Sequence, residues 1–464
     1  MSRTSMMIGL AVSLAACAES EPSPDTAPLD THDATTDTTG TTGDTTATTD
    51  TTGTTGDIAP GPTPAWWELG MGDPFLDELV LYYLGNAAHG GTEVAEVLET
   101  ARRVDDDTPA AWTRAWQATA ARLDAVAQAS EAAGHLISAG HAYHRSSTYL
   151  RAAMHYHPDP RSPDVREMAQ AEVARFSKYL AYVFPDTASV VEIPYEGTTL
   201  TGYWFRAKTS EPAPTLIAHS GRDAWAEDLM YIARAGLERG YHTLLIDGPG
   251  QGKVMRIQGL PFRPDWEVFI TAVVDQLVSR PEVDPNRLVL LGASMGGYLA
   301  PRAATAEGRL ALVVANPGVV SWYGSILATL GSYLPDFEAV LAQGDEAFDR
   351  YVTALMPYSP FLAWGIEDMA WHHGVTTPSA LLHALSAFTF EGKADRIKAK
   401  VLVIDAEDEG PRGQARQLYE ALDPARRALV VFTREEAGQF HVQPGATQVL
   451  THKMFDWLDT ELAR

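Results

Sequence analysis

One serine between small residues is the first candidate for chemistry. Ser294 is the centre of Gly-Ala-Ser-Met-Gly at residues 292–296, a G-x-S-x-G pattern. The apolar run 288–291 before it predicts a strand buried on both faces, and residues 297–300 can open a helix. A strand, a sharp turn and a helix around this pattern form a nucleophile elbow, where flanking glycines leave room for neighbouring backbone. We interpret Ser294 as a nucleophile; an ordinary glycine-rich turn is the alternative.

A serine hydroxyl needs a base, and the base needs a carboxylate that orients it. His441 follows a predicted strand at 429–432 and is the only histidine between residues 384 and 451, so we interpret it as the base. The acid should follow the predicted strand at 401–404. Asp408 has the usual residue type at that loop position, whereas Glu409 fits if the loop is one residue longer. We favour Asp408 and keep Glu409 as the alternative.

An attacked carbonyl oxygen needs two backbone N–H donors. Met295, immediately after the serine, should supply one of them. The other should come from the turn after the predicted strand at 215–219, where Gly221 lets the backbone turn inward and the Arg222 N–H is best placed. The Arg222 side chain would separately suit a surface ion pair with Asp223 or Glu227.

The surrounding pattern predicts the fold that must position these groups. From residue 187 onward strands alternate with helices, which implies a mostly parallel, doubly wound sheet covered on both faces. Residues 63–186 instead predict four or five helices. Residues 316–400 are too long for a plain crossover and predict a helical insertion over the strand ends. His141 and His144 share a helix face, but no acidic ligand stands at metalloprotease spacing, so we expect no metal and no cofactor.

The first 62 residues have a different character. Arg3 precedes an apolar run, 6–16, of signal-peptide length that closes in Leu-Ala-Ala-Cys17, and this resembles a bacterial lipobox. A simple secretory signal is the alternative. Residues 18–62 are rich in Thr, Asp, Gly and Pro and predict a disordered linker. We therefore expect segments 1–17, 18–62, 63–186 and 187–464, in a protein exported from a bacterial cytoplasm and lipid-anchored through Cys17 on the periplasmic or cell-surface side.

Composition limits the partners. The chain has 464 residues, 45% hydrophobic and 20% charged, as in globular proteins. Its net charge of −25 disfavours nucleic acid as a partner. We expect a small-molecule carbonyl substrate and contact with a membrane only through the lipid. The oligomeric state stays open, with a homodimer as one candidate.

Several motifs together resemble one enzyme family. They are Arg-Ser-Ser-Thr-Tyr at 145–149, Ile-Pro-Tyr-Glu-Gly at 193–197, Asp-Gly-Pro-Gly-Gln-Gly at 247–252, Gly-Ala-Ser-Met-Gly-Gly at 292–297 and Gly-Gln-Ala-Arg-Gln-Leu-Tyr at 413–419. Residues 108–460 resemble the α/β-hydrolase superfamily, in particular enzymes similar to 2,6-dihydroxypseudooxynicotine hydrolase and related esterases. Two departures stand out: Ser220 replaces a glycine common in the oxyanion turn, and the loop at Asp408 is one residue shorter, which keeps the acid open.

The resemblance implies an α/β-hydrolase fold with an N-terminal helical cap, an active site between cap and core, and hydrolysis of an ester or of an activated carbon–carbon bond next to a ketone. We therefore expect a serine hydrolase that works through an acyl-enzyme. An acyltransferase or a peptidase on the same fold is the alternative chemistry. A non-catalytic binding lipoprotein is the alternative class of protein.

Overall fold

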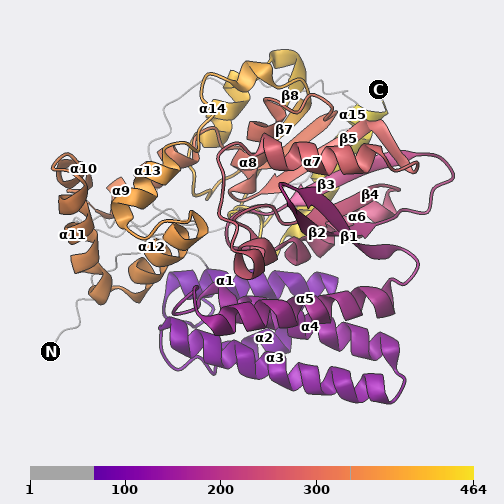
Figure 1. Cartoon of the computed structure of the whole chain (residues 1–464), viewed down its shortest axis with the longest axis horizontal. Coiled ribbons are helices and arrows are strands. Elements are labelled where there is room, and N and C mark those ends of the chain that lie inside the picture. Colours follow the sequence, from indigo (N-terminus) through magenta and orange to yellow (C-terminus); the bar gives the residue numbers. More distant parts are fainter. Residues whose placement is uncertain (1–66, 335, 464) are drawn as a thin grey trace, which may run out of the picture. The chain divides into compact units, whose positions relative to one another are not determined.

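The computed structural model describes residues 67–334 and 336–463 (Figure 1). Cys17 and the linker at 18–62, with the lipidation and disorder expected of them, lie outside the described residues. Within the described ranges, no helix is long and apolar enough to cross a membrane.

The centre of the structure is one sheet of eight strands in the order β1-β2-β4-β3-β5-β6-β7-β8. The strands are β1 (Ala188–Tyr195), β2 (Thr198–Phe205), β3 (Ala213–His219), β4 (His242–Ile246), β5 (Val283–Ala293), β6 (Leu312–Asn316), β7 (Lys400–Ala406) and β8 (Arg427–Phe432). The β1–β2 and β2–β4 pairs are antiparallel, and every other pair is parallel. The mostly parallel sheet predicted from the sequence is therefore confirmed.

Helices cover both faces of this sheet. They are α6 (Met230–Glu238), α7 (Glu267–Val278), α8 (Gly296–Ala304), α14 (Gln414–Ala421) and α15 (Thr447–Leu462). Strand β5 shows the two faces, because successive side chains on a strand point in opposite directions. Leu288 and Leu290 belong to the apolar cluster that contains the inner sides of α7 and α8. Val289 and Leu291 belong to the cluster that contains those of α6 and α15.

In the described part of the chain, five α-helices precede the sheet: α1 (Pro74–Gly85), α2 (Val94–Ala101), α3 (Pro109–Ala132), α4 (Leu136–His155) and α5 (Pro163–Val183). We call them the N-terminal helices. The sequence starts α3 sharply, since Thr108 caps the N–H of Ala111 and a proline follows it at the first helical position. Trp112 and Trp116 on α3 are fully buried, with ring centroids 5.1 Å apart. They are core residues, as expected for most tryptophans at helical spacing.

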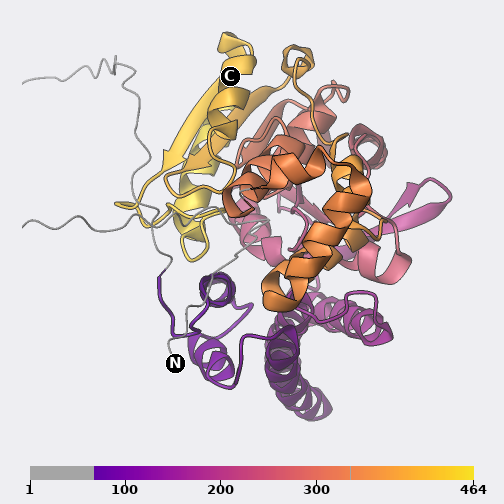
Figure 2. The same ribbon diagram turned by 90° about the vertical axis from the view of Figure 1, so that its left-hand side faces the viewer.

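A second group of helices lies between β6 and β7: α9 (Trp322–Tyr333), α10 (Phe337–Leu341), α11 (Asp345–Leu355), α12 (Pro360–His372) and α13 (Pro378–Leu385). Figure 2 shows these orange helices beside the N-terminal helices drawn in indigo and purple. The contact is aromatic. The ring centroids of Phe75, on α1, and Phe361 are 4.4 Å apart, and those of Tyr156 and Trp364 are 5.2 Å apart. Both helical groups thus meet close to the sheet.

Candidate active site

Ser294 lies on a strained turn between β5 and α8. Its φ angle is 60°, a left-handed conformation that a residue with a side chain adopts only when its surroundings enforce it. Its N–H donates to the Asn316 carbonyl at 2.7 Å. A Cβ on Gly292 would lie 1.9 Å from the Gly296 carbonyl oxygen, and one on Gly296 would lie 2.7 Å from that of Ser220. The two glycines are therefore required by close backbone approach, as the sequence predicted.

The turn brings Ser294 to His441, although 147 residues separate them in the chain. The Ser294 Oγ lies 2.9 Å from His441 Nε2. His441 Nδ1 lies 2.5 Å from Glu409 Oε1, and both side chains are buried. Each of the three residues follows the carboxyl end of a parallel strand, β5, β8 or β7, where loops of α/β sheets gather their functional groups. The serine, imidazole and carboxylate form one continuous hydrogen-bonded chain.

Asp408 does not contact His441, so the prediction that Asp408 orients the imidazole is wrong. Its carboxylate instead accepts hydrogen bonds from Arg434 Nε at 3.0 Å and Nη2 at 2.6 Å. The reason is the length of β7, which continues to Ala406 instead of ending at residue 404. The loop after β7 therefore starts later than predicted, and Glu409, the alternative acid, faces His441.

Burial and neighbouring charge affect the ionisable groups at this edge of the sheet. Partial burial raises the pKa of Asp405 to about 6, and the nearby Glu409 adds to the effect. Burial lowers the pKa of His219, at the end of β3, to about 4. His219 Nε2 accepts a hydrogen bond from Trp266 Nε1 at 3.4 Å, which suits a neutral ring. His219 is therefore a structural histidine.

The turn after β3 approaches Ser294 closely at Gly221. A Cβ on Gly221 would lie 2.6 Å from Met295 N and 3.0 Å from Ser294 Oγ, so only glycine leaves this space open. Arg222 follows directly, which places its backbone on the same turn. Its side chain pairs with Asp223 through Nε and Oδ1 at 2.9 Å and is only 3% exposed. The ion pair considered for Arg222 thus exists, but it is buried instead of lying on the surface.

Gln251 holds this turn in place, and the sequence analysis did not single it out. Its amide Nε2 donates to the carbonyl oxygens of Ser220 at 2.5 Å and Gly221 at 3.0 Å. Its Oε1 accepts from the N–H of Gly248 at 2.9 Å, which fixes the amide orientation. The sequence could have indicated Gln251, because this residue belongs to the Asp-Gly-Pro-Gly-Gln-Gly motif at 247–252. Its contacts give that motif a role: the glutamine holds the carbonyls of Ser220 and Gly221 and so fixes the turn beside Ser294.

A small cavity of about 50 Å³ opens beside Ser294. The core contributes Gly221 and Asp228 to its wall, and the N-terminal helix α1 contributes Tyr82. The loop after His441 closes another side with Val442. Ser294 therefore borders a cavity whose wall is built from both the core and the N-terminal helices.

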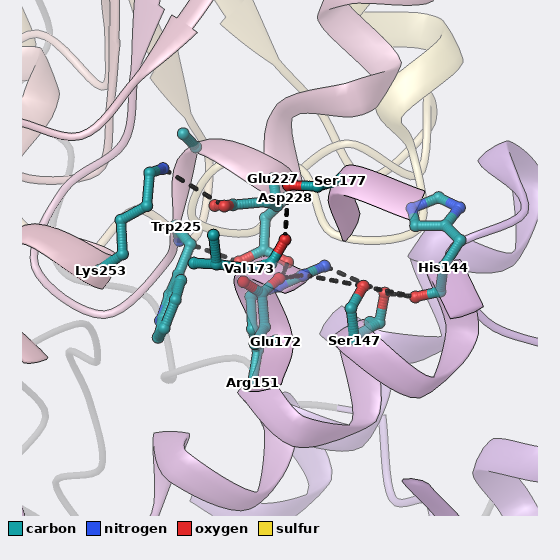
Figure 3. Close-up of polar contacts among 12 residues, drawn as sticks. His144, Ser147, Arg151, Glu172, Val173, Ser177, Trp225, Glu227, Asp228 and Lys253 are labelled. Carbon is teal, nitrogen blue, oxygen red and sulfur yellow. Dashed lines mark hydrogen bonds and ion pairs between the residues drawn. The ribbon is translucent and has the colours of Figure 1, made fainter. Parts of the chain in front are cut away.

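A buried network of charges ties the N-terminal helices to the cavity wall (Figure 3). Arg151 of α4 donates from Nε to Asp228 Oδ1 at 2.9 Å, and it also pairs with Glu172 of α5. Asp228 lies in the short helix Ala226–Leu229 and lines the cavity. Its neighbour Glu227 lies 3.2 Å from the ammonium of Lys253. Because these side chains are at most 4% exposed, the attraction between them is poorly screened by solvent.

The described residues contain no group of three or more His, Cys, Asp or Glu side chains that could hold a metal ion. His144 stacks on Tyr179 with centroids 4.0 Å apart, and burial lowers its pKa well below the usual range. His141 packs near the same ring, at 6.1 Å. These two histidines belong to the packing between α4 and α5.

Comparison with known proteins places this arrangement in a family. A family model described as the alpha/beta hydrolase family matches residues 213–450, more than half of the chain. The chain belongs to the alpha/beta hydrolase family. It is 32% identical to hydrolase LUC6 of a Fusarium species, over 82% of this chain and 94% of that protein. It is 31% identical to 20-hydroxy-prefusarin hydrolase FUS2 of Gibberella moniliformis, over 82% of this chain and 95% of that one. The chain is a hydrolase by this relationship.

The same fold, including the helices before the sheet, occurs in a crystal structure of 2,6-dihydroxy-pseudo-oxynicotine hydrolase. The TM-score is 0.60 at 20% identity, covering 81% of this chain and 94% of that one. The structure of AbyA5 matches with a TM-score of 0.57 at 19% identity, covering 83% of this chain and 95% of that one. The predicted resemblance and the predicted α/β-hydrolase fold are therefore both confirmed.

The comparisons contradict the expected localisation. The curated relatives named above are fungal hydrolases, and further relatives come from Aspergillus aculeatus and Aspergillus fumigatus. The expectation of a lipoprotein exported from a bacterial cytoplasm rested on the resemblance of the residues before Cys17 to a lipobox. That short pattern does not outweigh relatives that match over 82% of the chain or more.

Proposed function

We propose that this hydrolase uses Ser294 as a nucleophile and works through an acyl-enzyme. The observation that carries the proposal is the continuous chain from Ser294 Oγ to His441 Nε2, at 2.9 Å, and from His441 Nδ1 to Glu409, at 2.5 Å. Both distances are within hydrogen-bond reach, as nucleophilic catalysis requires.

In the proposed mechanism, His441 takes the serine proton as Ser294 attacks a carbonyl carbon. Glu409 holds the imidazole in the tautomer that accepts this proton and stabilises the imidazolium that results. The negative oxygen of the tetrahedral intermediate is held by the backbone N–H groups of Met295 and Arg222. His441 then gives its proton to the leaving group, and a water molecule, activated in the same way, releases the acyl group from Ser294.

The substrate we propose is a small carbonyl compound, either an ester or a molecule with an activated carbon–carbon bond next to a ketone. Support comes from the motifs shared with enzymes similar to 2,6-dihydroxypseudooxynicotine hydrolase, above all the segment at 247–252. The small volume of the cavity beside Ser294 also supports a small substrate, because a long peptide would need an extended groove.

The test is a comparison of the wild type with Ser294→Ala. We expect the wild type to hydrolyse p-nitrophenyl butyrate and to react covalently with a fluorophosphonate probe. Ser294→Ala should lose turnover and labelling while its thermal unfolding stays unchanged. Undiminished labelling of this variant would show that another residue is the nucleophile.

A further inference from the structure

Helix α1 runs along the loop that carries His441. Its C-terminal end packs so closely on this loop that a Cβ on Gly85 would lie 2.6 Å from Gly445 N. Just beyond the helix, His89 Nε2 lies 2.8 Å from Thr447 Oγ1. Tyr82 and Gly85 line the cavity beside Ser294. One face of α1 is therefore turned towards the site.

Glu78 belongs to that same face. It precedes Tyr82 by four residues and Gly85 by seven, and residues at these spacings lie above one another on a helix. Its side chain is buried, with 9% of the residue exposed. Its Oε2 has no hydrogen-bond partner anywhere in residues 67–334 and 336–463. Neighbouring Asp77, by contrast, accepts from the backbone N–H groups of Leu69 and Met71.

A buried carboxyl oxygen without a partner, such as Oε2 of Glu78, is unfavourable for folding, because it gives up its hydrogen bonds to water and gains none in return. Such groups are uncommon in folded proteins, and a functional role or an absent ligand is a recurring explanation. Burial raises the pKa of Glu78 well above its usual range, and the charges of Asp223 and Glu409 raise it further. Asp223 follows the oxyanion turn and Glu409 contacts His441, so Glu78 lies within electrostatic reach of both sides of the site.

A neutral carboxylic acid can donate a hydrogen bond, which a carboxylate cannot. Enzymes use a carboxyl group kept neutral by burial to stabilise an oxygen that becomes negative during the reaction. In the cleavage of a β-diketone two oxygens gain charge. The attacked carbonyl becomes the oxyanion held by the backbone, and the second carbonyl becomes an enolate when the carbon–carbon bond breaks. A simple ester has no such second oxygen.

We propose that Glu78 donates a hydrogen bond to the second carbonyl oxygen of a β-diketone substrate. This inference rests on the proposed function and adds a residue to its carbon–carbon bond cleavage. The Ser294 Oγ forms a bond to one carbonyl carbon, and the bond from that carbon to the central carbon breaks. The electron pair enters the enolate, whose oxygen is held by Glu78. The imidazolium of His441 returns the serine proton to the central carbon, so that a methyl ketone leaves and Glu78 keeps its own proton.

The experiment compares 1-phenyl-1,3-butanedione with p-nitrophenyl butyrate on the full chain. Glu78→Leu removes the donor and leaves a side chain of similar volume, and Glu78→Gln retains an N–H donor. Glu99→Leu is the control, since Glu99 is an exposed carboxylate of the N-terminal helices that pairs only with Arg102 at the surface. For each variant we would measure kcat and KM on both substrates, the melting temperature and fluorophosphonate labelling.

We expect Glu78→Leu to lower kcat/KM for the diketone at least tenfold, mainly through a lower kcat. The kcat/KM for the ester should change by less than twofold. Its melting temperature should be equal to or above that of the wild type, because an unpartnered polar group has been removed. Glu78→Gln should keep more diketone activity than Glu78→Leu, and Glu99→Leu should match the wild type.

Equal losses on both substrates would overturn the inference, as would no loss on the diketone. A wild type that cleaves esters only would also overturn it. In each of these cases labelling at Ser294 would leave the proposed function standing. A wild type whose labelling does not depend on Ser294 would remove the proposed function itself.

Discussion

Replacing Glu409 by glutamine should disable the enzyme, whereas replacing Asp408 by asparagine should not. Glu409 Oε1 lies 2.5 Å from His441 Nδ1, and both groups are at most 4% exposed, so the imidazolium of the proposed mechanism would have Glu409 as a buried counter-charge. Glu409→Gln keeps the size of the side chain but removes the charge and permits the wrong imidazole tautomer. By analogy with triads that lose their acid, kcat should fall roughly 10³- to 10⁴-fold, about 4–5.5 kcal/mol of transition-state stabilisation.

Asp408→Asn is the matched control. Asp408 pairs with Arg434, whose side chain is 54% exposed although that of Asp408 is only 7% exposed, so this variant weakens an ion pair of the loop but removes no group that contacts the imidazole. Its kcat should stay within about twofold of the wild type on this reasoning. The assay is hydrolysis of p-nitrophenyl butyrate, with thermal unfolding of all three proteins. If Asp408→Asn lost activity and Glu409→Gln kept it, the assignment of the acid would be refuted.

Three further predictions concern the surroundings of the site. Gly221→Ala should lower kcat at least about 100-fold and also lower the melting temperature, since its Cβ would lie 2.6 Å from the backbone nitrogen of Met295 and the turn would have to shift; unchanged kcat would argue against an oxyanion hole here. Arg151→Met should lower the free energy of unfolding in urea by about 3–5 kcal/mol, because Asp228 would stay buried without its cation; a loss below about 1 kcal/mol would contradict this. Asp405 has a pKa of about 6 when folded, above its value of 3.8 in the unfolded chain, so the folded state binds the extra proton. Stability should therefore fall by up to about 3 kcal/mol as pH rises from 4 to 6, and Asp405→Asn should flatten that slope.

The parts of this protein that the sequence predicted are those governed by local pattern. The apolar run before Ser294 and the glycines around it defined the strand, turn and helix, because close backbone contact permits few other residues there. Chain order and strand position were enough to select His441.

Features that depend on exact element ends or on distant contacts were harder to predict. Strand β7 extends two residues beyond its predicted end, so the loop that follows starts later than predicted, and Glu409 instead of Asp408 lies against His441. Element ends are the least reliable part of any reading from sequence. The pairing of Arg151 with Asp228 joins residues 77 positions apart, so no periodicity reveals it. Glu78 likewise reads as an ordinary helical glutamate until its burial is known.

The proposal that Ser294 forms an acyl-enzyme is tested most directly by rapid-quench mass spectrometry with p-nitrophenyl butyrate. We predict a burst of p-nitrophenol equal to the enzyme concentration and a butyryl group on the peptide that contains Ser294. Glu409→Gln should slow the formation of this butyryl adduct, but the adduct should still be on the peptide that contains Ser294. A butyryl group on another residue, or turnover in which no covalent adduct forms at any time, would contradict the account.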